Sequence, residues 1–96
     1  MAIKLLNEKR IDELIQFINK EEITKEYLKQ NHKIIYINEE QEINGIIIFD
    51  VFKNEIELSL GNEKTKQQLI NVIKKIAFKD ITYQNKTIII PTKQQF

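Results

Sequence analysis

The 96-residue sequence contains no cysteine and no tryptophan, one proline and two glycines. Without cysteine the chain forms neither a disulfide framework nor a thiolate zinc site, and a single histidine, His32, offers too few ligands for another metal cluster. We therefore predict no metal site and interpret His32 as a loop residue. No apolar run approaches the roughly 20 residues that a membrane-spanning helix needs, and residues 1–6 lack the apolar core of a signal peptide. We expect a soluble, cytoplasmic protein without membrane contact.

An excess of one charge sign is also missing, because the formal net charge is +1 although 30% of the residues are charged. No field of the whole molecule attracts nucleic acid or an anionic membrane. The charges are nevertheless segregated, with acidic residues around the middle of the chain and lysines after residue 60. The acidic set is a candidate surface for a basic protein partner, although ordinary solubilising charge is the simpler explanation. Its candidate partner-binding residues are Glu39, Glu40, Glu42, Glu55 and Glu57. The lysines lack accompanying arginines or aromatic residues, so we do not expect nucleic-acid binding.

Length and a hydrophobic content of 42% fit one domain over residues 1–96. Residues 3–6 predict a strand, and Asn7 behind them can cap a following helix. Four aliphatic residues at helical spacing then predict an amphipathic helix: Ile11, Leu14, Ile15 and Ile18. A second, short helix is predicted around Ile23, Tyr27 and Leu28.

Three strands follow in the middle of the chain. Residues 34–37 form a β-branched and aromatic run, and residues 43–52 are nearly all apolar, which predicts a central strand buried on both faces. Residues 55–60 alternate strictly, so Ile56, Leu58 and Leu60 are expected on one face and Glu55, Glu57 and Ser59 on a solvent face.

The last third begins with a strand break at Gly61-Asn62. Thr65 to Gln68 has the spacing of a capping box, which predicts a helix start there, with an apolar stripe of Leu69, Ile70, Ile73, Ile76 and Ala77. Residues 81–83 and 87–90 then form either one bulged strand or a hairpin, stopped by Pro91.

The resulting order β-α-α-β-β-β-α-β resembles the GNAT acetyltransferase fold. Ile3 to Leu6 followed by Ile11 to Leu14 looks like the opening strand and first helix of that family, and residues 38–48, with Gly45 before an aliphatic run, look like its second hairpin. The resemblance covers approximately residues 3–90. It implies an α+β fold with a mixed, mostly antiparallel sheet that lacks the family's C-terminal part, since the chain stops at Phe96. A sheet edge left bare in this way predicts a possible homodimer through that edge.

The resemblance also implies where an acetyltransferase would place its site. The family binds the cofactor pyrophosphate on an Arg/Gln-x-x-Gly-x-Gly/Ala loop before the helix, where this chain has one early glycine and bulky side chains. The corresponding candidates for cofactor binding are Gly61, Asn62, Lys64 and Lys66. Glu55 and Glu57 lie where the family sometimes places a general base, although a solvated strand face explains them as well.

We therefore hypothesise a non-catalytic, GNAT-like protein-interaction module that needs no cofactor. Its size suits a small inhibitor or adaptor encoded by a phage or mobile element, such as an anti-CRISPR or other anti-defence protein. The alternative, from a different class, is a minimal acetyl-CoA-dependent N-acetyltransferase with an atypical loop.

Overall fold

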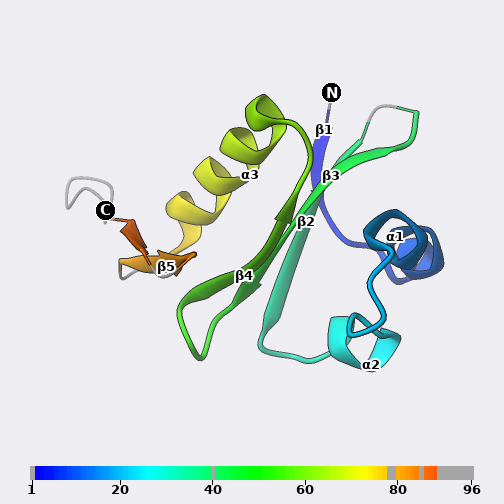
Figure 1. The fold of residues 1–96 in the computed structure, drawn as a ribbon, viewed down its shortest axis with the longest axis horizontal. Helices are drawn as coiled ribbons and strands as arrows, with labels where there is room; N and C mark the ends of the chain where they lie inside the picture. The colour runs from blue at the N-terminus through cyan, green and yellow to red at the C-terminus, as the bar shows by residue number, and fades with distance from the viewer. Residues whose placement is uncertain (1, 40, 78–79, 85, 89–96) are drawn as a thin grey trace.

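The computed structural model describes residues 2–39, 41–77, 80–84 and 86–88, which form an α+β domain. Its described part contains three α-helices, a 3-10 turn and six strands in one mixed sheet of order β1-β2-β3-β4-β5-β6 (Figure 1). All neighbouring strands pair antiparallel except β4 and β5, which pair parallel.

The chain enters through β1 (Ala2–Leu5), η1 (Glu8–Arg10), α1 (Ile11–Ile18) and α2 (Lys25–Leu28). The Asn7 side chain accepts a hydrogen bond of 3.0 Å from the backbone N–H of Lys9, so the predicted cap is confirmed, although it caps η1. Asn19 ends α1 in the left-handed conformation, which asparagine tolerates better than most residues. The two predicted helices are therefore present, and the aliphatic stripe of α1 is turned inward.

The meander consists of β2 (Lys33–Glu39), β3 (Ile43–Asp50) and β4 (Glu55–Leu60). α1 and α2 cover one face of the sheet, and α3 (Glu63–Ile76) covers the other (Figure 1). Because β3 lies between two strands and two helical layers, Ile46 and Ile48 pack toward α1 while Ile47 and Phe49 pack toward α3. The predicted central strand is confirmed. It ends at Asp50, however, so Val51 and Phe52 lie in the following turn.

The expected single apolar face of β4 is wrong. Ile48 is opposite Leu58 while Phe49 is opposite Ile56, so Glu57 is an additional residue that shifts the register. Such a bulge reverses the alternation. Ile56 therefore packs toward α3, whereas Leu58 and Leu60 pack toward α1. The expected solvent face is wrong too, because Ser59 is buried and Glu57 is largely covered.

The predicted capping box at Thr65 is also wrong. The helix begins earlier, at Glu63, and Asn62 caps it by accepting a 2.8 Å hydrogen bond from the Thr65 N–H. Thr65 is buried against Gly45, where an added Cβ would lie 2.4 Å from the Thr65 methyl carbon. At Gly45, α3 lies so close to β3 that the Thr65 side chain packs against the strand. Asn62, and not Thr65, therefore caps the helix.

β5 (Ile81–Tyr83) and β6 (Lys86–Ile88) form an antiparallel hairpin, which decides between the two alternatives left open by the sequence. α3 lies in the crossover between the parallel strands β4 and β5, which pair at Glu55 with Thr82 and at Ile56 with Tyr83. The predictions for residues 89–90, Pro91 and the end at Phe96 lie outside the described residues.

Candidate functional site

A buried charge cluster joins the beginning of β2 to the end of β3. The Lys33 ammonium lies 3.0 Å from Asp50 Oδ2, also contacts the Glu57 carboxylate, and lies 4.6 Å from the centre of the Tyr27 ring. The side chains of Lys33 and Asp50 are only 4% and 2% exposed, and that of Glu57 is 17% exposed. Lys33 and Asp50 are direct partners in the β2–β3 register, and the β4 bulge brings Glu57 to them.

The electrostatics of the cluster keep Asp50 ionised. Burial alone would raise the pKa of Asp50, but the Lys53 N–H, the Lys33 ammonium and the nearby His32 together lower it below its ordinary value. Burial raises the pKa of the Tyr27 phenol, and the negative charges of Asp50 and Glu55 add to that effect. Buried charges destabilise a fold unless they are paired, so the three charged side chains depend on each other.

The same cluster organises the turn after β3. Asp50 Oδ1 accepts a 3.0 Å hydrogen bond from the Lys53 N–H, and the Val51 N–H donates to the His32 carbonyl at 2.9 Å. The His32 ring stacks on the Phe52 ring, with centroids 4.7 Å apart and planes inclined by 9°. These contacts hold the turn and the Phe52 side chain in a defined position.

The turn displays apolar side chains to solvent. Phe52 is 82% exposed and Val51 is 47% exposed. Beside them lies a hollow of about 370 Å³, floored by apolar side chains of β2, β3 and α3; its lining is Ile34, Phe49, Val51, Phe52, Asn54, Ile76 and Ala77. We call this combination of turn and hollow the Phe52 surface. Exposed aromatic side chains beside an apolar hollow are typical of contact sites for another protein.

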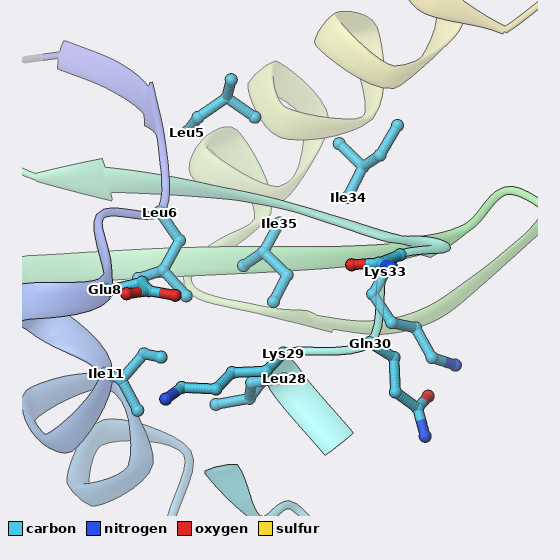
Figure 2. Close-up of a pocket in the computed structure, with 11 residues that line it drawn as sticks. Leu5, Leu6, Glu8, Ile11, Leu28, Lys29, Gln30, Lys33, Ile34 and Ile35 are labelled. Atoms are coloured by element: carbon cyan, nitrogen blue, oxygen red, sulfur yellow. The ribbon is translucent and has the colours of Figure 1, made fainter. Parts of the chain in front are cut away.

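A second hollow, of about 350 Å³, opens on the other side of the sheet, between β1, η1, α2 and the beginning of β2. Leu6, Ile11 and Ile35 point toward one another across it (Figure 2). Its rim is polar and carries Glu8, Lys29 and Gln30. We call it the edge hollow, since it opens where β1 leaves the side of β2.

The candidate acidic surface is not assembled as one free face. Glu39 is paired with Lys4 at 2.6 Å and with Arg10, and Glu57 is held by Lys33. Glu42 is exposed and Glu55 is half-buried, while Glu40 lies outside the described residues. The role of these five residues in partner binding stays a prediction, and two of them already have partners within the chain.

The acetyltransferase candidates are dispersed in a similar way. Of the two candidate bases, Glu57 is engaged by Lys33 while Glu55 is not ion-paired to it. At the start of α3, Gly61 has a φ of 131° and the Asn62 side chain occupies the Thr65 N–H. Lys64 is exposed, whereas Lys66 lines a polar hollow between α3 and the β5–β6 hairpin.

Neither the Phe52 surface nor the charge cluster was found from the sequence. The signal for the cluster was present, since Lys33 and Asp50 are charged residues at the ends of strongly apolar runs. The exposure of Phe52 had no clear signal, because Val51 and Phe52 are apolar residues that resume directly after Asp50 and look like a continuation of the strand.

Within the described ranges, no group of three or more acidic or histidine side chains is suited to a metal ion, and no helix has the length and apolarity to cross a membrane. Comparison of the chain with protein-family models, curated proteins and solved structures finds no match.

Proposed function

We propose that this protein is a non-catalytic protein-interaction module of GNAT-like arrangement, acting as a small inhibitor or adaptor. The observation that carries the proposal is Phe52, an aromatic side chain exposed to 82% and yet held in place by His32. Such a side chain is costly to leave in water and gains binding energy when a partner covers it. Its fixed position reduces the entropy that binding would cost.

The surroundings of the proposed anchor support the same function. A buried charge cluster is an expensive way to hold a turn, and here it holds the turn that presents Val51 and Phe52. The partner that fits this surface has a cleft for the Phe52 ring and an apolar side chain for the adjoining hollow. Contact through an aromatic anchor and a neighbouring hollow is the usual composition of the energetic centre of an interface.

The GNAT-like arrangement is part of the proposal. The order of helices and strands agrees with it, and so do the antiparallel meander and a helix that leads to a parallel strand. Lack of catalysis is supported by Glu57, which is committed to Lys33, and by the Asn62 side chain, which takes up a backbone donor at the start of α3.

The test uses a matched pair of phenylalanine substitutions. Phe52→Ser removes the proposed anchor, whereas Phe17→Ser changes a 37% exposed phenylalanine on α1 and serves as the control. A binding partner is first captured from the native host with the immobilised wild-type chain and then purified. The affinity of this partner for the wild-type chain and for each variant is measured by calorimetry. We expect Phe52→Ser to weaken binding by about 30-fold or more and Phe17→Ser by no more than about twofold.

Equal binding by both variants would contradict the proposed surface. Titration with acetyl-CoA separates the two classes of function, because binding at micromolar concentration would overturn the non-catalytic proposal in favour of an N-acetyltransferase.

A further inference from the structure

The edge hollow has an apolar floor that is part of the core. Ile11, Leu28 and Ile35 line it and are each only 5% exposed, and the half-buried Leu6 completes it. Figure 2 shows Leu6, Ile11 and Ile35 directed into the space between β2 and the helices. Because α1, α2 and β2 all contribute, the floor is formed by the fold itself and is present before a ligand binds.

The rim of the edge hollow carries one charge of each sign. Glu8 is the first residue of η1, and Lys29 follows α2, where its N–H donates to the Lys25 carbonyl at 3.0 Å. Figure 2 shows the ammonium end of Lys29 on the side of the hollow where Glu8 and Ile11 lie. A carboxylate and an ammonium group therefore stand beside the same apolar floor.

These two charges have no partner of opposite sign in the part of the chain that the structure describes. Neither Glu8 nor Lys29 takes part in an ion pair there, with each other or with another residue. Arg10, two residues after Glu8, is instead engaged by Glu13 at 2.9 Å and by Glu39. The rim charges are thus available to the charges of a ligand.

The backbone around the hollow is nearly used up by internal hydrogen bonds. The Lys33 N–H donates to the Gln30 carbonyl at 3.0 Å, and the Ile35 carbonyl accepts from the Leu6 N–H at 2.9 Å. Only the Lys33 carbonyl is left on this side of β2 without a donor among the described residues. An extended peptide would find too few backbone partners, so a small molecule is the better occupant.

We propose that the edge hollow binds a free α-amino acid with a large apolar side chain. Its ammonium group pairs with Glu8, its carboxylate pairs with Lys29, and its side chain packs on the apolar floor. Charge complementarity selects the zwitterion, because Glu8 repels a simple anion and Lys29 repels a simple cation. A volume of about 350 Å³ lies at the lower end for ligand pockets and suits a molecule of this size.

This inference goes beyond the proposed function and does not depend on the Phe52 surface. The probe is L-leucine, titrated into the folded, ¹⁵N-labelled protein and followed by amide chemical shifts. Glycine, which has the same two charges but no side chain, is the matched control ligand. We expect saturable shifts at Leu6, Glu8, Lys29 and Ile35 with a Kd of about 1 mM or tighter, and binding of glycine that is at least about tenfold weaker.

Blocked ligands assign each charge to its partner. Glu8→Gln should weaken binding of L-leucine by about fivefold but should not weaken binding of N-acetyl-L-leucine, which has no ammonium group. Lys29→Met should weaken binding of L-leucine to a similar extent but should not weaken binding of L-leucine amide, which has no carboxylate. Glu22→Gln and Lys20→Met, at exposed positions between α1 and α2, are the matched control variants and should change the affinity for L-leucine by less than about twofold.

Three results would overturn the inference. One is the absence of saturable shifts up to about 20 mM L-leucine. Another is binding of glycine as tight as that of L-leucine, which would leave the apolar floor without a role. The third is an equal loss for the free and the blocked ligand in Glu8→Gln or Lys29→Met, which would show that the charges do not recognise the zwitterion. The proposed function is tested separately, with the protein partner of the Phe52 surface.

Discussion

Replacing Lys33 by methionine tests how far the charge cluster supports the fold. Methionine retains much of the length of lysine but leaves Asp50 and Glu57 as neighbouring carboxylates without the ammonium between them. Removing one partner of a buried ion pair costs about 3–5 kcal/mol, because the remaining charge stays desolvated. Asp50 is 2% exposed and cannot regain water, whereas Glu57 at 17% can turn partly outward. We therefore expect a loss near the lower limit, about 3 kcal/mol.

The assay is urea unfolding followed by circular dichroism at neutral pH. With an m-value of about 1–3 kcal/mol per molar urea, this loss lowers the unfolding midpoint by about 1–3 M. Lys20→Met, at an exposed lysine between α1 and α2, is the matched control and should change stability by less than about 0.5 kcal/mol. A loss of less than about 1 kcal/mol for Lys33→Met, the range of surface pairs, would refute the reasoning.

A neutralised version of the cluster distinguishes charge from packing. Asp50→Asn and Glu57→Gln, combined with Lys33→Met, remove both unpaired carboxylates, and the asparagine oxygen can still accept the Lys53 N–H. We expect the triple variant to recover most of the stability lost by Lys33→Met alone. If it remains as unstable as the single variant, the lysine stem contributes by packing and not by its charge.

Three further predictions concern the same framework. The pKa of Asp50 is lower in the folded than in the unfolded chain, so its ionised carboxylate stabilises the fold fully at pH values above the unfolded-state pKa, and this stabilisation is lost as the pH falls through the folded-state pKa. Urea unfolding at a series of pH values from neutral to acidic should show this decline, and Asp50→Asn should make the pH dependence flatter. Gly45→Ala should destabilise the domain by about 1–3 kcal/mol, because the new methyl carbon would lie 2.4 Å from Thr65 Cγ2, and Thr65→Ser should relieve part of that loss; equal unfolding midpoints of Gly45→Ala and wild type would contradict the contact. Asn62→Ala should lower the free energy of unfolding by about 1 kcal/mol, because α3 loses its N-terminal cap. Thermal or urea unfolding measures this loss, and an unchanged midpoint would mean that Asn62 is not the residue that caps the helix.

Local pattern alone determined much of this architecture. The stripe of Ile11, Leu14 and Ile18, the continuous apolar run from Ile43 and the break at Gly61-Asn62 predicted α1, the central strand and the end of β4. These features depend on the spacing of apolar residues, with a period of 3.6 residues in helices and 2 in strands, and on the backbone preferences of single residues. Both can be read from residues that are close together in the sequence. The order of elements followed from them.

Register and exposure were decided by tertiary structure. The β4 bulge reverses the direction of Ile56 relative to Leu58, and no local pattern of Glu55 to Leu60 marks it, because it depends on pairing with β3. In the same way, Thr65 resembled a helix cap in sequence but packs against Gly45, a residue twenty positions earlier.

The candidate site belongs entirely to this second group. Lys33, Asp50 and Glu57 are distant in sequence and come together because β2, β3 and β4 are adjacent strands. Their burial, which makes the charges depend on one another, results from the packing of the helices on the sheet. Val51 and Phe52 continue an apolar run that in sequence looks like more of the core, yet the strand ends at Asp50 and carries them into solvent. A sequence states which side chains are apolar. Which of them the fold leaves uncovered depends on long-range packing, and here that packing leaves Phe52 exposed beside an apolar hollow.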